Sequence, residues 1–358
     1  QRDRLVHHPY DDFGATVLRL LDTAADDPAV ISIRMTLYRT GEQSPVVDAL
    51  LRAAAAGKEV VAFVELKASF DEARNIAWVR RLEAAGAQVV YGVVGLKNHA
   101  KVLLVARREQ GEVRRYAHIG TGNYNVTTAR FYTDLGLLTV DPAIADDLAD
   151  LFNQLTGSSR APGAELRRLL VAPEHLRTGI LERIEREAAH ARAGRAAAVR
   201  AKLNGLDDAE VVRALYQASR AGVEIDLVVR GLCTLMPGVP DQSDRIRVRS
   251  LVGRWLEHGR IYHFTNGGDE EFYLASADWR SRNLRRRVEV AVPVLDPACR
   301  EILRRVLADE LADPSAWLLA PDGSYQQAAR LAVGDPATAQ ARAMAGTPRS
   351  DEEVVWAG

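Results

Sequence analysis

Two short sequence features each occur twice in this chain, and the two copies of each are separated by a similar number of residues. The motif Ala-Gly-x-Glu stands at residues 56–59 and again at 221–224, each time between a helical pattern and an apolar run, with its glycines 222 − 57 = 165 residues apart. A histidine two residues before a cation occurs at His99 and His258, which are 258 − 99 = 159 residues apart. This recurrence predicts a duplicated unit. Halves of that kind usually pack about a pseudo-twofold axis, which would bring the two histidines together.

Apolar runs of strand length alternate with helical patterns and therefore predict an α/β fold. We expect mixed, mostly parallel sheets flanked by helices. The expected strands are 30–38, 60–64, 88–91, 102–105, 114–119 and 134–140, and the expected helices are 13–21, 46–56, 71–85 and 143–156. Residues 166–196 are expected to be helical, and the pattern of the first half returns from Ala197.

The domain boundary is expected near residue 165, after a stretch rich in glycine and serine at 157–163. Residues 1–165 then form a first domain, residues 166–320 a second, and residues 321–358 a poorly structured tail. The chain opens at Gln1 rather than at a methionine, as expected of a piece of a longer protein.

The charges nearly cancel, with 47 basic and 48 acidic side chains among 358 residues. No global field therefore attracts nucleic acid or a membrane surface, and any anion site must be local. No run of 18 apolar residues occurs, which argues against stable membrane insertion. Cys233 and Cys299 form no CxxC pair, and reduced thiols suit a cytoplasmic protein.

The first histidine lies in the stretch Gly95–Leu104, just ahead of an apolar run. If this stretch is one strand, Lys97, His99 and Lys101 point to the same face. An imidazole between two ammonium groups can receive an anion, and histidine can act as a nucleophile. Alone, the pattern is more typical of an inert histidine at a strand edge.

The second histidine repeats the arrangement with arginine in place of lysine, as His258 and Arg260. Arginine suits bidentate contact with phosphate oxygens. A small polar turn follows each histidine by roughly 20 residues, at 120–123 and at 276–279. The second site therefore strengthens the anion interpretation of the first.

Two His-x-cation elements in a duplicated chain resemble the phospholipase D superfamily. That resemblance implies that one histidine attacks phosphorus and the other acts as a general acid, while Lys and Asn side chains hold the oxygens. The superfamily pattern continues to an aspartate, where this chain has Ala106 and Thr265. A phosphodiesterase is therefore kept only as an alternative.

The longer sequence segments around these elements resemble bacterial polyphosphate kinase, the histidine-phosphorylated family. The resemblance covers about residues 5–315 and only that family's two C-terminal, phospholipase D-like catalytic domains. It rests on the segments Thr36–Arg39, Val64–Glu72, Gly95–Lys101, His118–Asn125, Ala129–Asp134, Val229–Cys233 and Ser276–Asn283.

This resemblance implies reversible transfer of the ATP γ-phosphoryl group to inorganic polyphosphate through a phosphohistidine, with Mg2+ as cofactor and ATP or ADP as partner. His99 matches the phosphorylated histidine and His258 its acid–base partner. Arg39 and Ser69 match magnesium-site positions, and Ser69 stands where the family usually has arginine. The expected nucleotide- and phosphate-binding residues are Tyr132, Arg230, Arg282, Lys97, Lys101, Arg260, Asn123 and Asn283.

Two further points stay open from the sequence. A fragment that binds polyphosphate without turnover fits the loss of the arginine at Ser69. A homo-oligomer is also compatible with the sequence.

Overall fold

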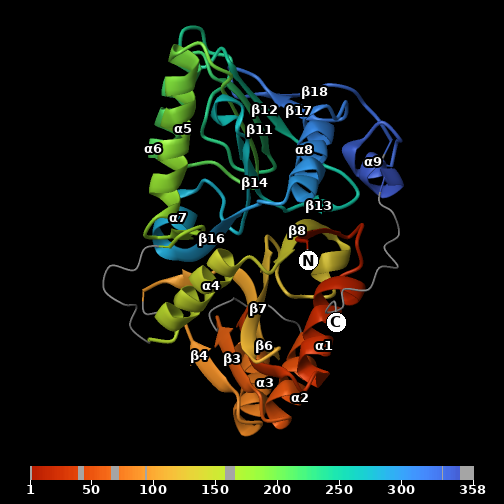
Figure 1. Ribbon diagram of the computed structural model, residues 1–358. Helices are drawn as coiled ribbons and strands as arrows, with labels where there is room; N and C mark the ends of the chain where they lie inside the picture. Colours follow the sequence, from red (N-terminus) through yellow and green to blue (C-terminus); the bar gives the residue numbers. More distant parts are fainter. Residues whose placement is uncertain are drawn as a thin grey trace. The chain divides into compact units, whose positions relative to one another are not determined.

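The computed structural model describes residues 2–38, 44–65, 72–92, 95–157, 166–332 and 334–346 (Figure 1). The chain divides into two compact units between Leu169 and Leu170. The boundary expected at residue 165 lies outside the described residues. Each unit contains one sheet with helices on its faces, so the predicted mixed α/β class with two sheets is confirmed.

The sheet of the first unit has the strand order β1-β8-β7-β6-β2-β3-β4. Its elements are β1 (Arg4–His8), a π-helical turn (Gly14–Leu18), α1 (Arg19–Asp26), β2 (Val30–Leu37), α2 (Pro45–Ala55), β3 (Glu59–Val64), α3 (Glu72–Ala84), β4 (Gln88–Tyr91), β5 (Lys97–Asn98), β6 (Lys101–Glu109), β7 (Glu112–Gly120), a 3-10 turn (Thr128–Arg130), β8 (Tyr132–Thr139) and α4 (Pro142–Leu155).

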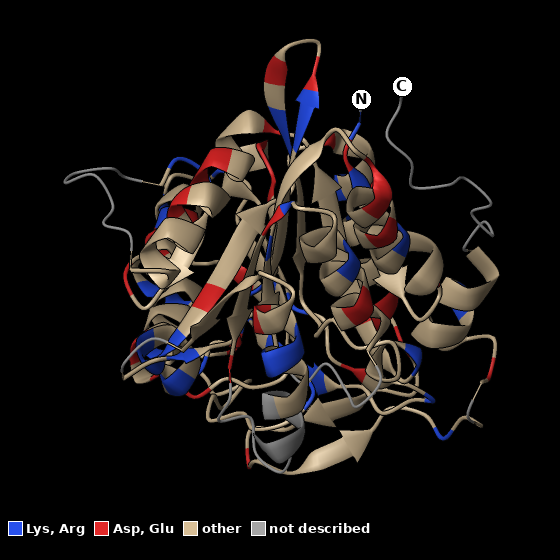
Figure 2. Ribbon diagram, turned by 90° about the horizontal axis from the view of Figure 1, so that it is seen from below, with Lys and Arg blue, Asp and Glu red and all other residues tan. Residues whose placement is uncertain are grey.

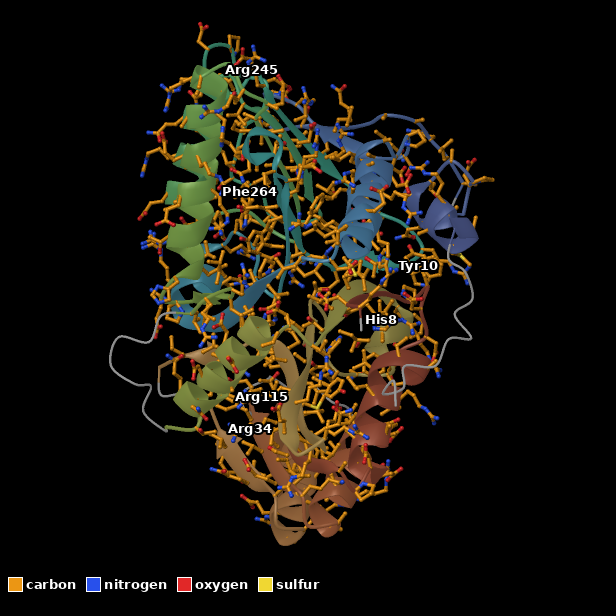
Figure 3. All side chains as sticks on the ribbon, in the orientation of Figure 1. His8, Tyr10, Arg34, Arg115, Arg245 and Phe264 are labelled. Atoms are coloured by element: carbon orange, nitrogen blue, oxygen red, sulfur yellow. The ribbon has the colours of Figure 1, made fainter. Side chains whose placement is uncertain are left out.

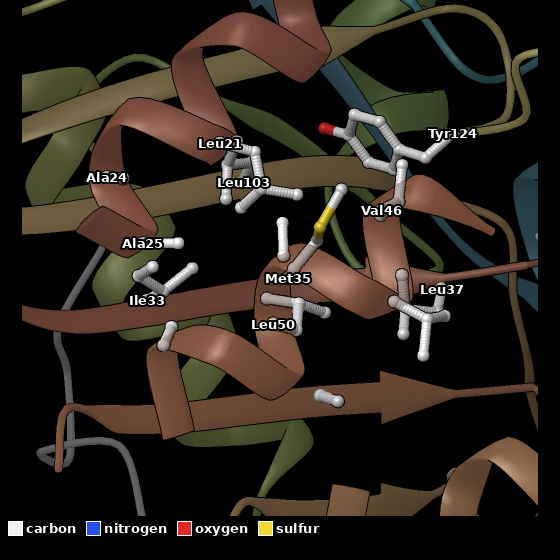
Figure 4. Close-up of a cluster of buried hydrophobic side chains, with 14 of the residues drawn as sticks. Leu21, Ala24, Ala25, Ile33, Met35, Leu37, Val46, Leu50, Leu103 and Tyr124 are labelled. Carbon is white, nitrogen blue, oxygen red and sulfur yellow. The ribbon is translucent and has the colours of Figure 1, made fainter. Parts of the chain in front are cut away.

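Helix α2 shows how the sequence sets these boundaries. Ser44 caps it by accepting the Val47 N–H, and Pro45 occupies the first turn, where no N–H partner is needed. The helix stops before Gly57, whose φ of 78° is left-handed. Its apolar face, including the fully buried Leu50, packs on Met35 and Leu103 of the sheet (Figure 4). Burial of one such side chain contributes about 1.5–3 kcal/mol.

Helix α4 lies on strands β6 and β7 of the same sheet. Asp141 caps it by accepting the Ile144 N–H at 3.0 Å. Two arginines join the helix to the strands, since Arg34 donates to Asn153 at 3.0 Å and Arg115 donates to Asp146 at 2.7 Å (Figure 3). Strands β2 and β7 are therefore held to α4 by polar contacts as well as by the core.

The sheet of the second unit has the strand order β18-β17-β12-β11-β10-β14-β15-β16, with β9 on the far edge of β16. Its elements are β9 (Leu170–Ala172), α5 (Leu176–Arg192), β10 (Ala198–Leu203), α6 (Ala209–Arg220), β11 (Glu224–Val229), β12 (Ile246–Ser250), β13 (Leu256–Glu257), β14 (Ile261–Phe264), a 3-10 turn (Asn266–Gly268), β15 (Glu271–Ala275), α7 (Ser281–Arg286), β16 (Arg287–Pro293), α8 (Pro297–Leu311), β17 (Trp317–Leu319), β18 (Tyr325–Gln327) and α9 (Ala339–Gly346).

The predicted predominance of parallel pairing is wrong. Among the pairs of described strands within each unit, only β2–β3, β3–β4, β10–β11 and β11–β12 are parallel. Helices α2 and α3 join β2, β3 and β4 as βαβ crossovers in the first unit, and α6 joins β10 to β11 in the second, whereas, apart from β11–β12, the other described pairs within each unit are antiparallel. The β6–β7 hairpin shows the reason, because Gln110 and Gly111 both have positive φ and close it in two residues.

Two other segments differ from the expectation. The helix expected over 166–196 is interrupted by β9, which pairs antiparallel with β16, and only Leu176–Arg192 is α-helical. The segment expected to be a poorly structured tail contains β18 and α9, and Ala339 in α9 is buried. Edge pairing and helix docking order these residues, although their composition is weakly apolar.

Cys233 and Cys299 are both free thiols. Acidic and basic residues are interspersed along the ribbon (Figure 2). Of the described helices, none has the length and hydropathy needed to cross a membrane.

Candidate active site

His99 lies between two strands rather than within one. Strand β5 ends at Asn98 and β6 begins at Lys101, so His99 and Ala100 interrupt the extended chain. Lys97 is exposed, whereas Lys101 is only 1% exposed. The prediction that Lys97, His99 and Lys101 share one strand face is therefore wrong, because the alternation rule applies only to continuous strand.

The backbone on both sides of His99 is held by side chains from other strands. Glu65 follows β3 and accepts the Asn98 N–H at 2.9 Å. Thr36 of β2 donates its hydroxyl to the Ala100 carbonyl at 2.8 Å and accepts the Val102 N–H at 3.0 Å. Because β2, β3 and β6 belong to one sheet, the histidine is attached to the rigid part of the unit.

Lys101 also acts on the histidine directly. Its ammonium group donates a hydrogen bond to the His99 carbonyl. It lies 5.7 Å from the centre of the Tyr38 ring, and that ring meets the His99 imidazole edge-on at 5.6 Å between centroids. The Lys101 ammonium group, the Tyr38 ring and the His99 imidazole therefore lie close together.

The second histidine is held in the same way. Arg260 donates to the His258 carbonyl at 2.8 Å, and Asn204 donates to the same oxygen at 2.9 Å. Each His-x-cation element thus uses its cation to hold the carbonyl of its own histidine. The two His-x-cation elements that recur in the sequence thus make the same contact between side chain and backbone in the structure.

Arg260 forms a buried ion pair as well. Its guanidinium donates to both carboxylate oxygens of Asp278, at 3.2 and 3.3 Å, with the two residues only 3% and 4% exposed. Burial by itself would raise the pKa of Asp278, but the Arg260 charge and hydrogen bonds outweigh it and lower that pKa to about 2. Asp278 also accepts the Asn204 N–H at 2.7 Å. The pair therefore stays ionised at neutral pH.

The polar turns after the histidines are equivalent in detail. Thr121 donates its N–H to the Leu135 carbonyl at 2.9 Å, and its hydroxyl accepts the Leu135 N–H at 3.0 Å. Ser276 makes the same two bonds with Val290, also at 2.9 and 3.0 Å. The predicted equivalence of the two turns is therefore confirmed.

Sequence reasoning missed the carboxylates of these turns. The Thr121 hydroxyl donates to Asp134 at 2.6 Å, and the Ser276 hydroxyl donates to Glu289. Both acids lie 13 residues after their hydroxyl, since 134 − 121 = 289 − 276 = 13. That equal offset is a signal that could have identified them. Asn204 was missed as well, and its only signal was its place directly after strand β10.

Gly122 lies against one of these carboxylates and yields a prediction. A Cβ at this position would stand 2.2 Å from an Asp134 carboxylate oxygen. We expect Gly122→Ala to displace Asp134 and lower the free energy of unfolding by about 1–3 kcal/mol. Urea denaturation measures this, with Gly346→Ala as the control, because a Cβ there meets nothing within 4 Å. Equal midpoints for both variants would contradict the packing argument.

The other candidate residues occupy varied surroundings. Arg230 follows β11 and donates to the Asn204 side chain at 2.8 Å, which places it beside the His258 segment. Asn283 is 1% exposed and donates to Glu289 at 2.6 Å, so part of its hydrogen-bonding capacity is already used. Tyr132 begins β8. Burial and the charges of Arg280 and Arg287 lower the pKa of Arg282 on α7.

Asn123 differs from these residues in its hydrogen bonding. It follows Gly122 in the first turn, and its side-chain oxygen is buried with no hydrogen-bond partner among the described residues. Such a group is costly to bury. Asn123 therefore retains hydrogen-bonding capacity close to the Asp134 turn.

Two other buried histidines, His118 and His263, form hydrogen bonds within their own units. His118 bonds to the Tyr124 hydroxyl at 2.9 Å, and burial lowers its pKa to about 3. His263 bonds to Glu270 at 3.0 Å, and burial lowers its pKa to about 4. Both rings are neutral at physiological pH, and they support the sheets beside the site.

The magnesium-site residues expected from the sequence are Arg39 and Ser69. Both lie outside the described residues. Within the described ranges, no three His, Cys, Asp or Glu side chains gather closely enough to hold a metal ion. The described side chains thus do not form a metal cage.

Comparison with known proteins shows which family this chain resembles. The family model of polyphosphate kinase C-terminal domain 1 matches residues 1–161, and that of C-terminal domain 2 matches residues 169–340. A polyphosphate kinase of Thermosynechococcus vestitus is 55% identical over 326 residues, which are 91% of this chain and 44% of that protein.

Solved structures agree with the sequence match. Polyphosphate kinase from Porphyromonas gingivalis superposes with a TM-score of 0.86 at 41% identity, covering 96% of this chain and 52% of that one. Phosphatidylserine synthase from Haemophilus influenzae reaches 0.58 at 11% identity, covering 89% of this chain and 87% of that one, and shares the fold alone. This chain spans about half the length of the polyphosphate kinases that it matches. With two family models covering its two units in order, the chain belongs to the polyphosphate kinase family.

Proposed function

We propose that this chain is the catalytic half of a polyphosphate kinase, which transfers the terminal phosphate of ATP reversibly to inorganic polyphosphate. The observation that carries the proposal is the paired His-x-cation element, in which each cation holds the carbonyl of its own histidine. Family membership at 55% identity supports the same reaction. A cytoplasmic location and assembly into a homo-oligomer remain part of the proposal.

The proposed reaction has two transfers. A ring nitrogen of His99 attacks the γ-phosphorus, the bond to the bridging oxygen breaks, and ADP leaves with that electron pair. A terminal oxygen of polyphosphate then attacks the phosphohistidine, the N–P bond breaks, and the imidazole recovers its electron pair. His258 donates or accepts the proton at the oxygen that leaves or attacks. Because each transfer exchanges one high-energy bond for another, the sequence of steps runs in both directions.

The chain's residues contribute position and charge rather than further covalent chemistry. Phosphoryl transfer depends mainly on alignment and on neutralising the equatorial oxygens. Thr36 and Glu65 hold the His99 segment, and Asn204 holds the His258 segment. In the proposal the phosphates are bound by Lys97, Arg230 and Arg282, with Tyr132 and Asn123. The nearly buried Lys101, Arg260 and Asn283 support the site from behind and contribute charge and hydrogen bonds there. Mg2+ would neutralise charge on the ATP phosphates.

The test is direct detection of the phosphohistidine. We expect radiolabelled γ-phosphate from ATP and Mg2+ to appear on His99 as an acid-labile, base-stable adduct. The polypeptide used should carry this chain together with the rest of the family's length. Mass spectrometry under neutral conditions locates the adduct. Phosphate that is acid-stable, or that sits on another residue, would contradict the proposal.

A further inference from the structure

A glutamine on the C-terminal helix binds the backbone just before His258. The Gln340 carboxamide oxygen accepts the Trp255 N–H at 3.1 Å, and its nitrogen donates to the Trp255 carbonyl at 2.9 Å. The same nitrogen donates to the Glu257 carboxylate at 2.6 Å. The side chain therefore satisfies both backbone groups of one residue, as a neighbouring strand would.

The absence of a side chain at Gly253 leaves room for the Gln340 carboxamide. A Cβ at Gly253 would lie 2.4 Å from the Gln340 oxygen, so only glycine lets the carboxamide approach. Helix α9 is itself attached to the neighbourhood of α8. Ala339 donates its N–H to Asp313 at 2.7 Å, and Arg342 donates to Asp309 at 2.8 Å. Gln340 is thus presented from a fixed helix.

The contact continues into a buried charge cluster. Glu257 is 4% exposed, and its second oxygen accepts from Lys202 of β10, which is 1% exposed and also donates to Glu310 of α8. Burial raises the pKa of Glu310 to about 8, so this carboxyl group holds a proton at neutral pH. The Lys202 charge is then matched by the Glu257 carboxylate. One carboxylate oxygen of Glu257 is therefore bound by Lys202 of the sheet, and the other is bound by Gln340 of α9.

His258 is the next residue, and its carbonyl is bound by Asn204 and Arg260. The backbone is therefore fixed on both sides of the His258 Cα. We infer that Gln340 is a positioning residue for His258, acting through Trp255 and Glu257. This inference rests on the proposed function of His258 and adds a residue from the segment whose sequence suggested a loose tail.

The test replaces the carboxamide without removing its bulk. Gln340→Met retains the side chain's length and loses all three hydrogen bonds. Gln327→Met is the matched control, because Gln327 lines the same cavity as Gln340 but donates only a long bond of 3.5 Å to the Ser315 carbonyl. If Gln340→Met does not fold, Gln340→Asn retains the amide but shortens its reach by one methylene.

Two readouts separate positioning from mere stabilisation. In protein labelled at histidine, we expect the His258 imidazole signal, assigned with a His258→Gln spectrum, to shift in the Gln340 variant and to stay in place in the control. We expect kcat to fall about tenfold while the KM for ATP changes less than about twofold. A His258 signal identical in parent, Gln340 variant and control would overturn the inference. The spectrum decides this even if no phosphate reaches His99, so failure of the proposed function is distinguishable.

Discussion

Replacing His99 with glutamine is expected to lower phosphoryl transfer between ATP and polyphosphate by a factor on the order of 10⁴ or more, because the nucleophile is lost. Glutamine approximates the size of imidazole and leaves the backbone contacts to Lys101 and Thr36 in place. The measurement is transfer in both directions, together with phosphate incorporation. All three should disappear together, since each requires the same N–P bond.

A matched histidine provides the control. His175 has 53% of its side chain exposed and directly precedes α5. We expect His175→Gln to retain the parent rate. Substantial transfer in the His99 variant would show that another residue is phosphorylated, and it would contradict the assignment of the nucleophile.

Replacing Asp278 with alanine is expected to lower the free energy of unfolding by about 3–5 kcal/mol, because it leaves the Arg260 guanidinium buried without its counter-charge. The variant also removes the acceptor of the Asn204 N–H. Urea denaturation followed by circular dichroism measures the loss. Asp322 is an exposed control, for which we expect a change within about 0.5 kcal/mol on substitution by alanine.

A double variant separates the charge from the packing. In Arg260→Met with Asp278→Leu, neither partner is left as an uncompensated buried charge. We expect it to recover most of the stability lost by Asp278→Ala alone, because paired removal avoids the desolvation penalty. A double variant as unstable as the single one would show that packing, rather than charge, determines the loss.

The same ion pair predicts a pH dependence with a definite sign. The pKa of Asp278 is lowered from 3.8 to about 2 in the folded chain. Its contribution of about 2 kcal/mol is therefore present above about pH 4 and is lost as pH falls towards 2. The parent should lose stability over this range, and Asp278→Ala should lose about 2 kcal/mol less. Parallel curves for the two proteins would contradict the assigned pKa.

Local patterns in the sequence were sufficient for the repeat and for much of the secondary structure. The apolar run Val60–Val64 predicted β3, and the helical pattern over 46–56 predicted α2. These signals depend on periodicity and end chemistry, which a short segment carries by itself. Antiparallel pairing was missed because an isolated strand does not reveal which neighbour it joins.

The sequence by itself determined that the chain is a duplicated α/β protein with two His-x-cation elements, because these features recur within short windows of residues. Only the tertiary structure decided what the cations do. Lys101 and Arg260 turn inward to hold the histidine carbonyls instead of lining one strand face. The partners that complete the second site are far apart in the chain, as with Lys202 and Glu310, which are separated by 108 residues. Such contacts follow from packing of whole elements, so no local pattern predicts them.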